Sequence, residues 1–481
     1  MDVSLIQSKY MNKSAQILGF GRSTKPLCDI LLSVGASVTV RDKNELLLND
    51  ADALAFRDRG VKFILGDSYL EGLSGDYIFR SPAFRPDIKE ISDAVDGGAI
   101  LSSEIEFFME NTDAEIFGIT GSDGKTTTTT ITHLLLKKQL EKDGVGEAFV
   151  GGNIGNSLLP YLEKMTGRDA AVLELSSFQL MTLKKSPKRA AITNVSPNHL
   201  DWHIGMQEYI DAKCRIFEAG GCEAIVLNAD NAVTREIAER IDIPVIYFSG
   251  SKSEYRDIVP KNKSGCIAIY EDYGFIVASN GSWTKRMLDV SKIKVIGRHN
   301  IENYMTAIGL TYGCVSVDTI EAVAESFYGV KHRIQFVSEI DGVKYYNSSI
   351  DSSPTRTEAA INAIGGSIVA ICGGYDKKIP FDTLADTLTT KVKAVVLTGQ
   401  TAEKIHKAIL ECKTYDENKL AVYIESDFTA AVNKAREISA SGDLVVLTPA
   451  CASFGYFKNF EERGDRFIEI VKEFENKGEK I

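Results

Sequence analysis

The stretch GITGSDGKTTTTT, residues 118–130, lies between an apolar run and a segment with helical periodicity. A strand, a glycine-containing turn and a helix in this order form a phosphate-binding loop, in which backbone N–H groups and the helix N-terminus surround phosphate oxygens. Lys125 has the place of the lysine that neutralises the phosphates, and Thr126 has the place of the hydroxyl that ligates Mg²⁺. The stretch therefore predicts a parallel α/β fold with a triphosphate site.

The match to the phosphate-loop pattern G-x-x-x-x-G-K-[ST] is imperfect, because Ile119 stands where the first glycine belongs. The threonines of residues 126–130 are poor helix formers, and a bound triphosphate and metal at the helix start would offset that cost. Asp123 is an unusual neighbour for a triphosphate unless its side chain points away or binds the metal. The alternative is a plain strand, turn and helix without a ligand. The predicted ATP-contacting residues of the loop are Gly121, Ser122, Asp123, Gly124, Lys125, Thr126 and Thr127.

The composition is that of a soluble globular protein, with 44% hydrophobic and 25% charged residues. A chain of 481 residues is expected to form about three domains. It has no stretch apolar enough to span a bilayer and no basic, apolar leader, so we expect a cytoplasmic protein without membrane insertion. The net charge of −11 disfavours a nucleic-acid surface. The eight cysteines lack paired C-x-x-C spacing, which indicates reduced thiols.

Apolar runs alternate with helix-like segments through three successive series. The first includes apolar runs in residues 16–21, 37–42, 61–65 and 76–81, with helical patterns in 26–35, 45–60 and 88–98. The second includes a predicted hairpin in residues 266–279, and the third opens with a hairpin around Asp341 and Gly342. We therefore predict three α/β domains, residues 1–111, 112–329 and 330–481.

Polar residues at the predicted strand ends are candidates for chemistry, because ligands of open α/β sheets bind beyond the carboxyl ends of the strands. Glu174 ends the run AAVLEL and can ligate Mg²⁺ facing the phosphate loop, or it is an ordinary strand-end glutamate. His199, in NVSPNHLDWH, follows another strand, where a lone histidine is usually structural. Both become candidate catalytic and metal-binding residues beside the predicted phosphate loop.

Lys213 lies on the apolar stripe of the helical segment MQEYIDAKCRIFEA, residues 206–219. A buried ammonium group is costly, so the side chain either extends to the protein surface or is changed chemically. A carbamate would be an anion able to ligate a metal beside Glu174. In GRHNIENY, Asn300 and Asn303 share a helix face and can recognise a base edge, although helix capping by Asn300 is the alternative.

Loops of the first and third series offer further candidate binding residues. The segment ILGFGRSTKPLCDILL contains a strand, a G-x-G turn and a helix, and Asp42 ends the next strand. Thr24 occupies the third glycine position, which disfavours a nicotinamide cofactor but leaves a pyrophosphate or uridine site. The predicted contacts are Gly19, Phe20, Gly21, Arg22 and Ser23. In the third series, CGGYDKK and TPACASFGYFKNFEERGD present Lys377, Ser453 and Phe460 to a small anionic substrate.

The chain resembles the Mur ligase family over nearly its whole length. The motifs that carry the resemblance are GFGRS, SPAF, GSDGKTT, GGNIG, ELSSFQL, NHLDWH, AKCRIF, GRHNIEN, GVKHRIQ, SPTRTEAAI, GGYDKK and PACASFGYFKNFEERGD. The resemblance implies an N-terminal Rossmann-like domain for a UDP-sugar, a central P-loop ATPase-like domain, and a C-terminal Rossmann-like domain for an amino acid. The last motif, with ELSSFQL and GGNIG, is similar to the branch that adds D-glutamate.

The resemblance implies an ATP-dependent ligase that adds D-glutamate to UDP-N-acetylmuramoyl-L-alanine through an acyl phosphate, with ATP and two Mg²⁺ ions as requirements, acting as a monomer. Thr126, Glu174, His199 and carbamylated Lys213 are then the metal-binding residues. The resemblance adds Arg333 to the ATP-binding residues, Asp42, Ser81, Asn153 and His199 to the sugar-binding residues, and Ser352 to the D-glutamate-binding residues Lys377, Ser453 and Phe460.

The segment NSSIDSS, residues 347–353, departs from the D-S-K-A-T pattern of many family members. Ser348 replaces a carboxylate and Ile350 replaces a lysine, whereas Ser352 keeps a hydroxyl. Arg356 is expected to restore a positive charge if a helix begins here. Two alternatives follow: a ligase for another amino acid or acceptor, and a nucleotide-binding regulatory homologue that has lost catalysis.

Overall fold

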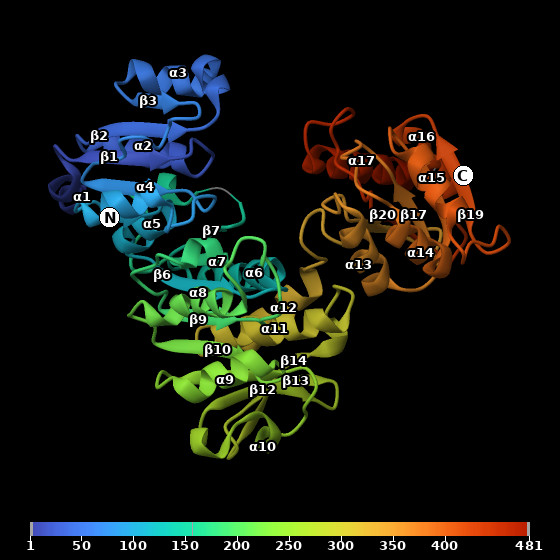
Figure 1. Ribbon diagram of the computed structural model, residues 1–481. Helices are drawn as coiled ribbons and strands as arrows, with labels where there is room; N and C mark the ends of the chain where they lie inside the picture. Colours follow the sequence, from blue (N-terminus) through green and yellow to red (C-terminus); the bar gives the residue numbers. More distant parts are fainter. Residues whose placement is uncertain (1–2, 156, 479–481) are drawn as a thin grey trace. The chain divides into compact units, whose positions relative to one another are not determined.

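The computed structural model describes residues 3–155 and 157–478 (Figure 1). They form two compact units, one built from the residues up to Lys292 together with His299–Glu325, the other from Ile293–Arg298 and the residues from Ser326 onward. Three sheets, each mostly or wholly parallel, with flanking helices confirm the predicted α/β class. Within the described ranges, no helix combines the length and apolar character that crossing a bilayer requires.

The first sheet has the strand order β3-β2-β1-β4-β5, with parallel neighbours throughout. Its strands are β1 (Ser14–Leu18), β2 (Ser37–Asp42), β3 (Lys62–Leu65), β4 (Tyr77–Arg80) and β5 (Ile100–Ser102). The helices are α1 (Val3–Tyr10), α2 (Thr24–Ser33), α3 (Ala51–Asp58), α4 (Lys89–Asp96) and α5 (Glu104–Asn111).

The helical pattern predicted over residues 45–60 is divided in two. A 3-10 helix, Glu45–Asn49, precedes α3. The Asn44 side chain accepts a hydrogen bond from the Leu46 N–H, and the Asp50 side chain accepts one from the Ala53 N–H. Each polar side chain therefore caps a separate helix start, which interrupts the longer pattern.

The central sheet has the order β14-β13-β12-β11-β10-β9-β6-β8-β7. Its strands are β6 (Glu115–Thr120), β7 (Ala148–Gly152), β8 (Ala170–Glu174), β9 (Arg189–Ile192), β10 (Ala224–Asn228), β11 (Val245–Ser249), β12 (Ile267–Asp272), β13 (Phe275–Ser279) and β14 (Thr284–Asp289). The pairing of β12 with β13 confirms the predicted hairpin. The helices are α6 (Lys125–Asp143), α7 (Ser177–Leu180), α8 (Met206–Glu218), α9 (Ala232–Arg240), α10 (Tyr255–Ile258), α11 (Arg298–Leu310) and α12 (Val317–Ser326), with 3-10 helices at Leu159–Tyr161, Lys261–Lys263 and Val290–Lys292.

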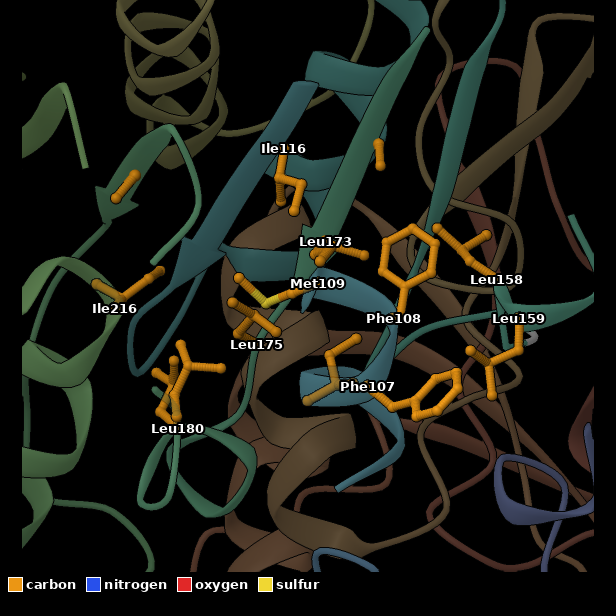
Figure 2. Packing of buried hydrophobic residues seen from close by; sticks show 14 of the residues in the cluster. Phe107, Phe108, Met109, Ile116, Leu158, Leu159, Leu173, Leu175, Leu180 and Ile216 are labelled. Atoms are coloured by element: carbon orange, nitrogen blue, oxygen red, sulfur yellow. The ribbon is translucent and has the colours of Figure 1, made fainter. Parts of the chain in front are cut away.

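Helix α5 joins the first sheet's helices to the apolar core of the central sheet. Figure 2 shows Phe108 and Met109 of α5 among side chains from β6, β8 and α7, including Ile116 and Leu173. Burying one such side chain stabilises the folded state by about 1.5–3 kcal/mol. The apolar core is therefore continuous from α5 into the central sheet.

The second unit contains a sheet with the order β15-β16-β20-β17-β18-β19. Its strands are β15 (Gln335–Ile340), β16 (Val343–Asn347), β17 (Ile368–Cys372), β18 (Val392–Thr398), β19 (Ala421–Glu425) and β20 (Leu444–Leu447). The β15–β16 hairpin confirms the turn predicted around Asp341 and Gly342, and both residues have positive φ. Its helices are α13 (Pro354–Ile364), α14 (Asp382–Lys391), α15 (Ala402–Glu411), α16 (Phe428–Glu437) and α17 (Phe460–Gly478).

Candidate active site

The loop between β6 and α6 has a backbone that only glycine accommodates at two positions. Gly121 and Gly124 have φ of 150° and 78°. A Cβ atom at Gly121 would lie 1.9 Å from Thr193 Oγ1, and one at Gly124 would lie 2.5 Å from Asn303 Oδ1. Ile119, at the position of the missing first glycine, is buried in β6. The loop thus has the narrow glycine-dependent shape of a phosphate loop without its first glycine.

Side chains that follow the neighbouring strand β9 hold this loop. The Asp123 N–H donates to Asn194 Oδ1 at 2.9 Å, and Thr193 Oγ1 donates to the Asp123 carbonyl at 2.6 Å. Ser122 Oγ donates to the Ser196 carbonyl at 2.9 Å. Asp123 itself is exposed. The sequence did not lead us to predict Thr193, Asn194 and Ser196 as residues that hold the loop. Their position after a strand beside β6 could have indicated this role.

Two lysines converge on one carbonyl oxygen of the loop. Lys125 Nζ donates to the carbonyls of Gly121 and Ser122 at 2.9 and 2.8 Å, and Lys213 Nζ donates to that of Gly121 at 2.7 Å. Lys213 is 1% exposed and lies over the Tyr209 ring, so extension to the surface is wrong. Burial, and then the charge of Lys125, lower the pKa of Lys213 well below its ordinary value. The charge of Lys125 favours an anion here, and burial beside that charge favours the neutral amine of Lys213.

Glu174 ends β8 with a buried carboxylate whose two oxygens differ. Oε1 accepts a hydrogen bond from Asn153 Nδ2 at 2.8 Å, whereas Oε2 is buried and has no hydrogen-bond partner among the described residues. A buried carboxylate oxygen without a partner is costly, and a cation would satisfy it. Within the described ranges, no three His, Cys, Asp or Glu side chains form a ready metal cluster.

His199 lies in the loop after β9, with a positive φ of 55°. Its ring centroid is 5.0 Å from that of Phe178. Burial lowers the pKa of His199, and the charges of Lys125 and Lys213 lower it further. Because the charges of both lysines act on His199, this residue belongs to the same site as the phosphate loop. The lowered pKa of His199 favours the neutral imidazole that a metal requires.

Helix α11 contributes two amides to the same region. It begins at Arg298, two residues before Asn300, so helix capping by Asn300 is wrong. Asn303 Nδ2 donates to Asn300 Oδ1 at 2.9 Å, and Thr128 Oγ1 donates to Asn303 Oδ1 at 3.2 Å. Asn303 therefore contacts α6 directly. The predicted loop residues Thr126 and Thr127 lie in the first turn of α6, half-buried.

The loop after β1 is closed by its own side chains. The Phe20 N–H donates to Asp42 Oδ2 at 2.8 Å, and Thr24 Oγ1 donates to the Gly19 carbonyl at 2.9 Å. The Phe20 ring is buried against Phe56, so its backbone alone remains for a ligand. The other predicted residues follow the strand ends: Gly21, Arg22 and Ser23 after β1, and Ser81 after β4, where a Cβ at Gly19 would contact its hydroxyl at 3.0 Å.

The second unit brings its predicted D-glutamate-binding residues to the carboxyl ends of the adjacent strands β16, β20 and β17. Ser352 follows β16, Lys377 follows β17, and Ser453 follows β20. The Tyr375 N–H donates to the Ala452 carbonyl at 2.9 Å and joins the last two loops. Phe460 begins α17, and the exposed Arg333 precedes β15.

The segment 347–353 contains a buried acid, Asp351. Asp351 accepts a hydrogen bond from Thr448 Oγ1 at 2.9 Å, and burial raises the pKa of Asp351 to about 6. Arg356 Nη1 donates to the Ile350 carbonyl at 3.3 Å, so a positively charged guanidinium group contacts the segment. Arg463 was not predicted to contact this segment. It is buried and donates to the carbonyls of Ser349 and Cys451.

Comparisons with known proteins agree with this geometry. Residues 119–311 match the Mur ligase middle domain, and residues 332–451 match the Mur ligase glutamate ligase domain. A UDP-N-acetylmuramoylalanine--D-glutamate ligase of Acetivibrio thermocellus is 44% identical over 98% of both chains, and one of Clostridium novyi is 42% identical over 96% of both.

The solved structure of a UDP-N-acetylmuramate-alanine ligase from Thermotoga maritima has a TM-score of 0.55 at 17% identity and covers 96% of this chain and 99% of its own. At that identity the likeness concerns the fold alone. The family domains and the relatives that match nearly end to end decide the assignment. The chain belongs to the Mur ligase family.

Proposed function

We propose that the chain is an ATP-dependent ligase that adds D-glutamate to UDP-N-acetylmuramoyl-L-alanine in peptidoglycan precursor synthesis. The observation that carries this proposal is the 44% identity, over 98% of both chains, to a ligase named for that reaction. The phosphate loop, with two lysines on the Gly121 carbonyl, supplies the chemical reason for ATP. We further propose a cytoplasmic monomer.

The reaction must activate a carboxylate, which is a poor electrophile at neutral pH. A carboxylate oxygen of the L-alanine moiety attacks the γ-phosphorus, and ADP leaves. The amine of D-glutamate then attacks the acyl phosphate, loses a proton, and expels inorganic phosphate that retains that carboxylate oxygen. The protein contributes positioning and charge stabilisation at each step.

Residues of the central sheet fit ATP and Mg²⁺. The glycine positions leave space where a Cβ atom would clash, and Lys125 would leave its loop carbonyls to neutralise phosphate oxygens. Thr126 and the unpartnered Glu174 Oε2 are the oxygen donors that Mg²⁺ prefers. Mg²⁺, when bound, would neutralise developing phosphate charge. Asn300, Asn303 and Arg333 complete the proposed ATP-binding set.

A second Mg²⁺ would be held by His199 and carbamylated Lys213. The lowered pKa of Lys213 supports this, because the neutral amine adds CO₂ and releases a proton. A carbamate would place an anion beside the charged Lys125.

We assign residues 1–111 to the UDP-sugar, 112–329 to ATP and 330–481 to D-glutamate. The proposed sugar contacts are Gly19, Phe20 (through its backbone), Gly21, Arg22, Ser23, Asp42, Ser81, Asn153 and His199. The proposed D-glutamate contacts are Ser352, Lys377, Ser453 and Phe460. Arg356 would supply the positive charge that Ile350 lacks, and Arg356→Ala should raise the KM for D-glutamate or lower turnover if it does.

The altered segment 347–353 favours one alternative, a nucleotide-binding homologue without catalysis. Phosphate release from ATP and Mg²⁺ separates the two, measured with UDP-N-acetylmuramoyl-L-alanine and D-glutamate, L-glutamate or no amino acid. The ligase requires both the sugar and D-glutamate. A sample that binds ATP and releases no phosphate under any of these conditions indicates the regulatory homologue, and release with a different amino acid indicates a ligase of different specificity.

A further inference from the structure

Arg85 extends from the loop after β4 to the first turn of α8. This loop also carries Ser81, and α8 carries Lys213. Arg85 Nη2 donates to Glu208 Oε1 at 2.8 Å and Nη1 donates to Glu208 Oε2 at 3.2 Å, which is a bidentate pair. Charge-assisted forks of this kind are strong and directional. The pair joins two sequence-distant segments, one predicted to bind the sugar and the other predicted to bind a metal.

Glu208 continues the contact into the loop that carries His199. Its Oε2 accepts the Ile204 N–H at 2.9 Å and lies 3.0 Å from His203 Nδ1. His203 Nε2 lies 2.9 Å from Ser177 Oγ, and its side chain is buried. Hydrogen bonds from Arg85, Ile204 and His203 favour the charged carboxylate and lower the pKa of Glu208 to about 2. The chain of contacts therefore ends on α7, three residues after Glu174.

The backbone and rings of the loop connect these contacts to His199. The N–H groups of Trp202 and His203 both donate to the His199 carbonyl, at 3.1 and 3.0 Å. The Phe178 ring stacks on His203 and meets the rings of His199 and Trp202 edge-on. Arg85 adds a hydrogen bond to the Trp202 carbonyl and lies 4.8 Å from the centre of its ring.

We propose that Arg85, Glu208 and His203 form a positioning network that fixes His199 relative to Lys213 and the phosphate loop. His199 has a positive φ, a conformation that a non-glycine residue keeps only when its surroundings hold it. The network supplies that support from outside the central sheet. None of the three residues needs to contact a substrate. The inference rests on the proposed function for its kinetic test only.

The first test compares Arg85→Ala with Arg59→Ala. Arg59 is a matched control because it also pairs with a carboxylate, that of Asp29, and lies against an aromatic ring, that of Phe56. We expect Arg85→Ala to lower kcat by between about tenfold and 100-fold, because small displacements of reacting groups have effects of that size, with the ATP KM changed less than about twofold. Arg85→Lys should recover only part of the loss, since lysine cannot form the fork. An unchanged kcat, or a change confined to the KM for the sugar, overturns the proposal.

The second test does not depend on activity. The chain contains two tryptophans, so Trp202 is the remaining one in a Trp283→Phe background. There, Arg85→Ala and Glu208→Gln should shift the Trp202 emission and increase its quenching by acrylamide, whereas Arg59→Ala should not. Unchanged emission and quenching in both variants would show that the loop keeps its position without the network. If wild-type protein releases no phosphate, the proposed function fails and the fluorescence result alone decides this proposal; Glu208→Gln serves if Arg85→Ala does not fold.

Discussion

The loops after β1 and β6 share one topology and differ in how their polar groups are satisfied. Both connect a parallel strand through glycines to a helix. In the β1 loop, residues 19–23, the carboxylate of Asp42 accepts a backbone N–H from within the protein. In the β6 loop, residues 121–124, the Gly121 carbonyl accepts hydrogen bonds from the side-chain nitrogens of Lys125 and Lys213 instead. The backbone of the β1 loop is therefore held by an acidic side chain, whereas positive charge lies beside the β6 loop.

A glycine-rich turn alone therefore does not determine which ligand binds. An acid beside the β1 loop disfavours a triphosphate there and suits a ligand with fewer charges, such as a uridine. Lysine side chains beside the β6 loop favour a polyanion. Burial, and then the charge of Lys125, lower the pKa of Lys213, and burial followed by nearby lysine charges lowers the pKa of His199. Four predictions test whether these two loops have the separate roles that this contrast implies.

The largest effect is expected at the β6 loop from Lys125→Ala. Removing a charge that stabilises phosphoryl transfer should lower kcat by at least about 100-fold. Lys137→Ala is the control, because Lys137 lies on the same helix and pairs with Glu141 at the surface at 3.9 Å. Steady-state phosphate release measures both variants. Equal activity in the two variants would contradict a phosphate role for Lys125.

Alanine substitutions in the two loops should have unequal effects. A Cβ at Gly124 would lie 2.5 Å from Asn303 Oδ1 at positive φ, whereas one at Gly21 has no heavy atom within 4 Å. We expect Gly124→Ala to raise the ATP KM about tenfold, because about 1–2 kcal/mol of left-handed strain must be relieved by moving the loop. Gly21→Ala should leave the ATP KM unchanged. Titration of each variant with ATP distinguishes them, and equal KM values would remove the contrast.

A smaller effect is expected at the β1 loop from Asp42→Ala. This change removes the acceptor for the N–H groups of Phe20 and Asn44. The loss of hydrogen bonds worth about 1 kcal/mol each should raise the KM for the UDP-sugar about fivefold to tenfold and leave the ATP KM unchanged. Asp29→Ala, a surface change in the same sheet's helices, is the control. An altered ATP KM would mean that the two loops do not act separately.

The last prediction concerns stability instead of turnover, and it is a pH dependence at Lys213. Its pKa is lowered on folding from 10.5, so this side chain releases a proton when the chain folds, and its contribution to stability rises with pH up to about 10.5. Lys213→Met lacks this dependence. In CO₂-free buffer, the unfolding free energy that Lys213→Met gains over wild type should therefore shrink as pH rises from 7 to 9, by up to about 1.4 kcal/mol per pH unit. The melting temperatures of the two proteins at each pH measure this difference. A pH-independent difference would contradict the buried amine.

Local patterns in the sequence predicted the loop after β6 and the hairpins, and they placed Lys213 on an apolar helix face without deciding whether it is buried. A lysine on an apolar stripe indicates that its helix face packs against apolar residues, and G-K-T after a strand indicates the backbone shape of a phosphate loop. Contacts between distant segments gave no such signal. Asn194 and Asp123 are 71 residues apart, and Arg85 and Glu208 are 123 apart. Which side chains meet there is decided by strand order and by packing.

Helix boundaries also depended on competing local interactions. The pattern of residues 45–60 fitted one helix, but the Asp50 side chain begins α3 by accepting the Ala53 N–H. Conversely, Asn300 looked like a cap and lies inside α11, where it pairs with Asn303. The same residue types stop or stabilise a helix according to their neighbours in space.

Transfer of ¹⁸O tests the central claim most directly, that the phosphate loop uses ATP to activate a carboxylate. UDP-N-acetylmuramoyl-L-alanine labelled with ¹⁸O in its alanine carboxylate is turned over with ATP, Mg²⁺ and D-glutamate, and the phosphate is analysed by mass spectrometry. An acyl phosphate predicts one ¹⁸O atom in each phosphate formed from doubly labelled carboxylate. Phosphate without ¹⁸O would show that water, and not the carboxylate, attacks the γ-phosphorus.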